Sequence, residues 1–214
     1  RGGSVTYLNQ GFGMDGVAND DGHPTILPSS GTWEYKVTYF YNLAQRGVRV
    51  ARLYGHDPQA YQVMMARGWE AVSQDMLETL DAAQSFGIRC ILTLGGLSDV
   101  NTWQQAKKLL DVNSQEFYDF KVFMARVADQ LSGHPALELL EALNEADFMN
   151  VITGHWLKEF PAGGMQLLRG YAQWQTALLD GVRALQKRPG TPLGMGTAMD
   201  GTLYCDAAGN PAMP

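Results

Sequence analysis

Two polar residues, an amide and a carboxyl group, end an apolar run near the middle of the chain. The run is "LELLEALNEAD", residues 137–147, and the two residues are Asn144 and Glu145. A carboxyl group with apolar walls and another acid nearby has its pKa raised toward neutrality, which suits a general acid. The alternative is a solvated turn in which the pair does no chemistry. The elements that position the pair decide between these interpretations.

Segments typical of strands and helices alternate along the chain. Short apolar runs predict strands at residues 4–9, 48–53, 88–94, 136–143 and 192–199. Amphipathic patterns predict helices at residues 33–47, 70–87, 114–133 and 164–186, with Gly47 and Gly87 as stops and Thr32 and Ser114 as candidate N-caps. Such alternation predicts an α/β protein with a parallel sheet that helices cover.

Two architectures fit this alternation, an open doubly wound sheet and a (β/α)8 TIM barrel. The Gly-rich segment "GFGMDG" has no helix directly behind it, which disfavours a dinucleotide-binding fold. The longest loops follow the strands, where barrel enzymes build their sites. We therefore expect residues 1–214 to form a single partial barrel domain with about the first five strands. Asn144 and Glu145 then lie at the barrel mouth, and Glu141, which has the parity of Glu145, is predicted to point inward.

Two motifs on these strands resemble clan A glycoside hydrolases, which include the family 5 cellulases and mannanases. "EALNEAD" is similar to the E-x-x-N-E signature at the end of their fourth strand, and "GVRVARLYG" resembles their second strand, with Arg52 at the arginine position. The resemblance extends over the five strands. It implies a hydrolase that cleaves β-linked glycans with retention and without a cofactor. It also implies that Glu145 is the acid/base, that Asn144 contacts the sugar beside the scissile bond, and that Arg52 supports the nucleophile.

The sequence departs from the family pattern at three points. Ala146 stands where the family commonly has proline, and "LTLGGLSD" lacks the histidine that often follows the third strand. The family nucleophile is a glutamate at the end of strand seven, which has no counterpart here, so the nucleophile is expected outside this chain. The chain then is a fragment of a longer enzyme, or a half-barrel completed by a second chain or copy, or an enzyme in which a local acid replaces the missing one.

Further candidates for substrate binding lie in the predicted loops after strands. Trp33 and Trp174 sit in predicted helices and are expected in the core, whereas Trp69, Trp103 and Trp156 could stack on sugar rings. His155 and His56 could bind substrate. Ordinary packing of the tryptophans and solvated histidines are the alternatives. The oxygen-rich segment at residues 19–23 lacks the spacing of a calcium loop, and no metal is expected.

The composition limits the remaining classes of function. The net charge is −6 with no basic cluster, which argues against nucleic acid and anionic membranes as partners. No apolar run approaches the roughly 18 residues that a membrane span needs. The two cysteines form no metal or redox motif, and Cys90, which lies inside an apolar run, is expected to be a core thiol.

The first interpretation is therefore a secreted or periplasmic glycoside hydrolase whose partner is an oligo- or polysaccharide. The chain opens with Arg1 rather than Met, which predicts that it has been processed or cut from something longer. A non-catalytic carbohydrate-binding partial barrel is the alternative. A lyase or aldolase is weaker, because no lysine sits at a predicted strand end for Schiff-base chemistry.

Overall fold

The computed structural model describes residues 12–13, 27–28, 33–54, 61–96, 108–109, 111–144 and 164–195. The helices among them are α1 (Trp33–Gln45), α2 (Tyr61–Arg67), α3 (Trp69–Gln84), α5 (Gln115–Leu131) and α8 (Gly164–Leu185). The strands are β1 (Phe12–Gly13), β2 (Leu27–Pro28), β3 (Val50–Tyr54), β4 (Arg89–Gly96), β5 (Leu137–Asn144) and β6 (Leu193–Gly194). Strands β3 to β6 are separated by helices, as the alternation in the sequence predicted.

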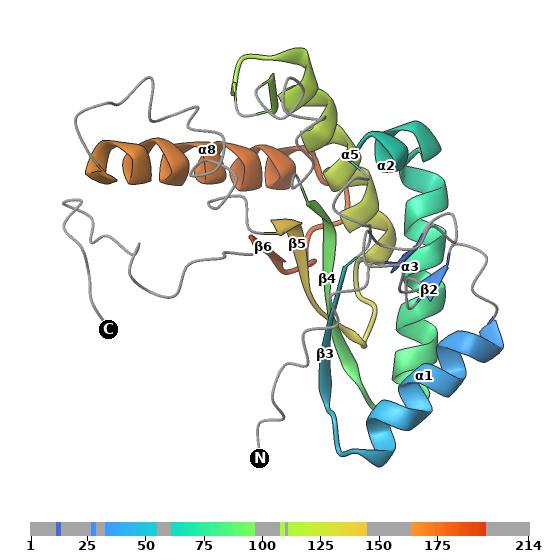
Figure 1. The fold of residues 1–214 in the computed structure, drawn as a ribbon. Helices are drawn as coiled ribbons and strands as arrows, with labels where there is room; N and C mark the ends of the chain where they lie inside the picture. Colours follow the sequence, from blue (N-terminus) through green and yellow to red (C-terminus); the bar gives the residue numbers. More distant parts are fainter. Residues whose placement is uncertain are drawn as a thin grey trace.

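The main sheet has the strand order β3-β4-β5-β6, and every neighbouring pair is parallel (Figure 1). In the register, Ala51 pairs with Cys90 and Thr93 pairs with Glu141. Strands β1 and β2 form a separate parallel pair. Neighbours in the main sheet are also successive strands of the chain, which is the strand order of a (β/α)8 barrel.

Helices α1, α3 and α5 lie on one side of the main sheet (Figure 1). Most strand side chains that join their hydrophobic core alternate along each strand, as expected when one face is covered. The alternating residues, which are fully or almost fully buried, are Ala51, Leu53, Cys90, Leu92, Leu94, Leu140 and Ala142. Leu143 of β5 has the opposite parity and is fully buried as well. We call this side the helix face of the sheet and the opposite side the inner face, because it corresponds to the barrel interior.

Local signals in the sequence set the ends of the helices. The hydroxyl of Ser114 accepts a hydrogen bond from the backbone N–H of Phe117 at 3.0 Å, which satisfies one of the free donors at the start of α5. Gly47 and Gly87 follow α1 and α3 with φ of 77° and 66°. Only glycine adopts such angles without strain, so the chain reverses there and enters the next strand.

Two polar side chains fix the segment between α8 and β6 onto α5. The buried carboxylate of Asp129 accepts hydrogen bonds from the backbone N–H groups of Lys187 and Arg188 at 2.8–3.0 Å. The hydroxyl of Thr191 donates to the carbonyl oxygen of Ala128 at 2.7 Å. These bonds hold the chain where it enters β6, so that Leu193 can pair with Leu140 at the edge of the sheet.

Most predicted elements are confirmed, with shifted ends. The strand predicted at residues 4–9 lies outside the described residues, as does Thr32, a candidate cap. Helix α2 had no counterpart in the prediction. Trp33 was expected in the core but is 46% exposed, because it is the first residue of α1, whereas Trp174 is buried as expected. Among the helices of the described segments, none combines the length and apolar character of a membrane span.

Candidate active site

Three polar side chains from three adjacent strands meet on the inner face of the sheet. They are Arg52 of β3, Thr93 of β4 and Glu141 of β5, and we call them the inner-face cluster. The register explains the meeting, because Thr93 and Glu141 are direct partners and Arg52 pairs with Ile91, which lies on the same face as Thr93.

The hydrogen bonds of the cluster converge on one carboxylate oxygen. Glu141 Oε2 accepts from Arg52 Nε at 2.9 Å, from Arg52 Nη2 at 2.6 Å and from Thr93 Oγ1 at 2.6 Å. Bonds between charged groups at these distances are the strong kind. Because two nitrogens along one edge of the guanidinium bind the same oxygen, the plane of the guanidinium is fixed relative to the carboxylate.

The cluster is shielded from solvent. The Arg52 and Glu141 side chains are 11% and 9% exposed, and Thr93 is fully buried. A charge in such surroundings costs free energy unless it is paired and hydrogen-bonded. Arg52 and Glu141 meet that requirement in each other, and the pair carries no net charge.

The cluster lies in the part of the strands closer to their carboxyl ends. Arg52 is two residues before Tyr54, the last residue of β3, and Thr93 and Glu141 are each three residues before the ends of β4 and β5. In a (β/α)8 barrel these ends form the active-site face. The arrangement therefore holds a guanidinium just below the rim at which catalytic groups of such barrels lie.

Of the residues predicted from sequence, the structure places the side chain of Arg52. Asn144 ends β5 and pairs with Gly96 in the register, and Glu145 follows it directly in the chain. Glu145, His56, Trp103, His155 and Trp156 lie outside the described residues, so their predicted roles stay predictions. The predicted inward direction of Glu141 is confirmed by its contacts with Arg52 and Thr93.

Thr93 is the member of the cluster that the sequence did not reveal. In "IRCILTL" it stands as one polar residue inside a buried strand, where threonine is an ordinary choice. Its parity relative to Cys90, Leu92 and Leu94 was the available signal, because those residues face the helices and Thr93 therefore faces inward.

Trp69 and Cys90 have structural roles in the described part of the chain. Trp69, considered for sugar stacking, is the first residue of α3 and packs against the core, with the guanidinium of Arg126 over its ring at 5.8 Å. This contact favours packing. Cys90 is confirmed as a core thiol, and burial raises its pKa to about 12, so it is not a nucleophile at neutral pH.

The described segments contain no group of three or more His, Cys, Asp or Glu side chains placed to hold a metal ion. Thr93, Arg52 and Glu141 supply a single carboxylate, which is already engaged by Arg52. The inner-face cluster is thus an ion pair with a hydroxyl donor.

Known proteins were similar to this chain in structure but not in sequence. No family model matches the sequence, and no curated protein matches it. A β-mannanase from the blue mussel Mytilus edulis matches the structure with a TM-score of 0.59 and 14% identity, over 84% of this chain and 56% of the mannanase. A β-1,4-mannanase from the common sea hare Aplysia kurodai matches with a TM-score of 0.56 and 17% identity, over 83% of this chain and 57% of that enzyme.

These likenesses confirm the predicted fold. The chain has the architecture of part of a (β/α)8 barrel of the kind found in glycoside hydrolases, and it spans a little over half the length of the two mannanases. The resemblance to clan A glycoside hydrolases that the two motifs indicated is confirmed at the level of the fold. Activity and substrate do not follow from a likeness at this identity, and they are matters for proposal.

Proposed function

We propose that this chain is part of a glycoside hydrolase that cleaves β-linked glycans with retention of configuration. In this proposal Glu145 is the acid/base, Asn144 binds the sugar beside the scissile bond, and Arg52 supports a nucleophilic carboxylate from outside residues 1–214. The observation that carries the proposal is the buried guanidinium of Arg52, held just below the carboxyl ends of the strands in a barrel whose neighbours include two β-mannanases.

The chemistry requires two carboxyl groups with different roles. Glu145 first gives its proton to the leaving glycosidic oxygen, while the nucleophile forms a bond to the anomeric carbon. Glu145 then takes a proton from the water that releases the sugar, so it acts once as acid and once as base. The two carboxyl groups of such enzymes lie about 5–5.5 Å apart. A guanidinium close to the nucleophile keeps that carboxylate ionised.

Substrate contacts beyond the reacting sugar are proposed for four side chains in loops after the strands. Trp103 and Trp156 present aromatic faces for the apolar faces of pyranose rings, and His56 and His155 supply hydrogen bonds to hydroxyl groups. We also propose that the protein is exported, because glycan polymers are outside the cell. Fractionation of the source cells would test that part.

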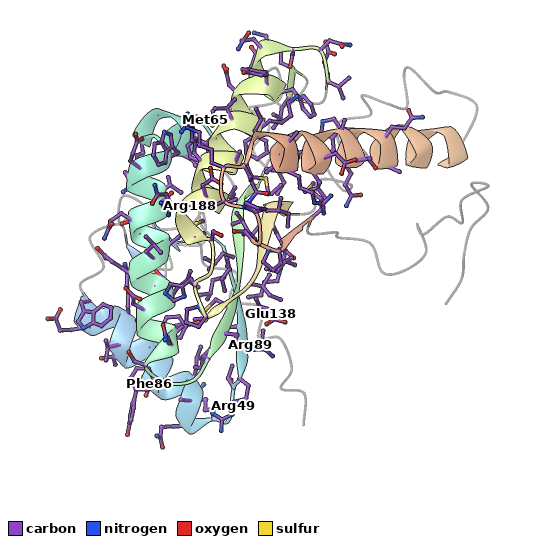
Figure 2. The ribbon with its side chains drawn as sticks, turned by 180° about the vertical axis from the view of Figure 1, so that it is seen from behind. Arg49, Met65, Phe86, Arg89, Glu138 and Arg188 are labelled. Carbon is purple, nitrogen blue, oxygen red and sulfur yellow. The ribbon has the colours of Figure 1, made fainter. Side chains whose placement is uncertain are left out.

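The decisive experiment compares two glutamates of the same strand region in the full-length protein. The variant Glu145→Gln removes the proton donor and is expected to lower turnover of β-mannan or β-glucan by about 10²–10⁴-fold, the usual contribution of general acid–base catalysis. Binding of the oligosaccharide, measured by titration calorimetry, should be retained. The control is Glu138→Gln, because Glu138 pairs with Arg89 near the amino ends of β4 and β5 (Figure 2) and is expected to leave turnover unchanged.

The outcome separates an enzyme from a binding module. Wild-type turnover that disappears in Glu145→Gln supports the hydrolase. Saturable glycan binding without turnover in the wild type supports the non-catalytic carbohydrate-binding barrel. Full activity of Glu145→Gln contradicts the assignment of this residue as acid/base.

A further inference from the structure

We propose that Glu141 and Thr93 are positioning residues that fix the guanidinium of Arg52 in the orientation in which it meets the catalytic carboxylates. This inference rests on the proposed function and adds two residues to its site. Neither residue needs to touch the substrate, because each acts through Arg52.

The pattern of donors and acceptors carries the inference. A guanidinium has five N–H donors in a rigid plane. Glu141 Oε2 binds Nε and Nη2, and therefore determines how the plane is turned about the end of the side chain. The N–H groups that Glu141 does not engage point away from that edge in fixed directions. An arginine whose plane is fixed in this way loses little rotamer freedom when it meets a carboxylate.

Thr93 binds the same carboxylate oxygen of Glu141 that binds Arg52. Its hydroxyl donates to the same Oε2 at 2.6 Å, from the neighbouring strand and from a fully buried position. Because β4 lies between β3 and β5, the hydroxyl fixes the carboxylate from the middle strand of the three. Removing this single hydroxyl would take away the bond from β4 that fixes Oε2, and would loosen the pairing of Oε2 with Arg52.

The same strands show that a charged pair is not required for folding at this depth. Their helix face is built from apolar residues at equal or greater burial, such as Leu92 and Leu140. A buried ion pair is often no more stabilising than apolar side chains of similar volume. A role in presenting the guanidinium gives a reason for Arg, Thr and Glu at these three positions of the inner face, which Leu143 of the same parity shows can also bury an apolar side chain.

The first test measures turnover in the full-length protein with matched threonine variants. Thr93→Val keeps the shape and removes the hydroxyl, and it is expected to lower kcat about tenfold with a small change in KM, the low end of what loss of an orienting partner costs at metal sites. Thr93→Ser restores the hydroxyl and should restore kcat. Glu141→Gln should lower kcat more than Thr93→Val does. The control is Thr79→Val, because Thr79 is equally buried and donates to the carbonyl oxygen of Asp75 within α3, and this variant should leave kcat unchanged.

The second test does not depend on turnover. Hydrogen exchange of the Arg52 Nε–H is followed by nitrogen-15 NMR, with the signal assigned by its loss in Arg52→Lys. Exchange should be slow in the wild type and in Thr79→Val, and faster in Thr93→Val, with Thr93→Ser returning to the slow rate.

The two readouts distinguish the possible failures. Unchanged exchange in Thr93→Val overturns the positioning inference whatever the activity. A wild type that turns over glycan, with kcat unchanged in both Thr93→Val and Glu141→Gln, overturns the inference and leaves the proposed function intact. A wild type without turnover on any β-glycan overturns the proposed function and the catalytic part of the inference, while the exchange rates still decide whether the two residues fix Arg52.

Discussion

The two faces of strands β3 to β5 differ in the polar groups that they bury. The helix face carries apolar side chains such as Leu53, Leu92 and Leu140, which are buried against the helices. The inner face carries Arg52 and Glu141 at almost the same burial. Apolar burial stabilises wherever it occurs, whereas a buried ion pair stabilises only when its geometry is close to ideal. We therefore expect the helix face to contribute most to stability, and the inner-face cluster to serve function.

Replacing the inner-face cluster by apolar side chains is the strongest test of whether its ion pair is needed for folding. The single variant Arg52→Met leaves the Glu141 carboxylate buried without its partner and is expected to lower the free energy of unfolding by about 3–5 kcal/mol. The triple variant Arg52→Met, Thr93→Val, Glu141→Leu removes all three polar groups and should regain most of that loss, because the Glu141 carboxylate is no longer buried without Arg52. Urea unfolding of the full-length protein measures both variants.

Activity should not follow stability in this series. If the inner-face cluster serves catalysis, the triple variant is stable and inactive. A triple variant that remains as unstable as Arg52→Met contradicts the view that the ion pair is dispensable for folding. A triple variant that is stable and fully active removes the functional meaning of the inner face.

The helix face is tested by the residue next to Thr93 in the chain. Leu92→Ala deletes a fully buried side chain from β4 and is expected to lower the free energy of unfolding by about 2–5 kcal/mol, through lost transfer free energy and the cavity left behind. Because Leu92 points to the helices, kcat per folded molecule should stay at the wild-type value. Thermal unfolding and turnover below the melting transition measure the two effects. A clear loss of kcat in the folded variant would show that the faces are not independent.

The helix face was also the easier part to predict from the sequence. Its residues are apolar and alternate, and the glycines Gly47 and Gly87 and the cap Ser114 mark helix ends by local physics that needs no knowledge of the rest of the chain. Helix α2 was missed because its seven residues, "YQVMMAR", are too short to show a helical period. Trp33 was placed in the core because residue type was weighed above its position at the start of a helix.

The inner face could be predicted only in part, because its contacts join residues far apart in the chain. Arg52 was found through its motif and Glu141 through its parity. Their hydrogen bond depends on the register of β3, β4 and β5, including an irregularity between Cys90 and Ile91 that shifts the pairing with β5. No local pattern encodes that register, so the convergence of Arg52 and Thr93 on one oxygen was not foreseeable.

The smallest expected effect concerns an ion pair between helices, which contrasts with the pair on the inner face. Lys36 of α1 is almost fully buried and donates to Glu78 of α3 at 2.9 Å, but the Glu78 side chain is 42% exposed. The hydrogen bond from Lys36 lowers the pKa of Glu78 below its ordinary value of 4.5, against the opposing effect of burial. A carboxyl group with a lowered folded-state pKa stabilises the fold above its unfolded value, and this contribution is lost as pH falls through the folded value.

The variant Glu78→Gln isolates that contribution. It should be slightly less stable than the wild type at neutral pH, and the difference in free energy of unfolding should narrow as pH falls below 4.5. Urea unfolding at a series of pH values measures the difference, and it should shrink in high salt, because solvent and ions screen a half-exposed pair. In a Lys36→Met background the pKa of Glu78 loses its main cause of lowering, so Glu78→Gln should there have a smaller pH-dependent effect on stability. A difference that is independent of pH would mean that Glu78 stabilises the helix pair by packing and not by its charge.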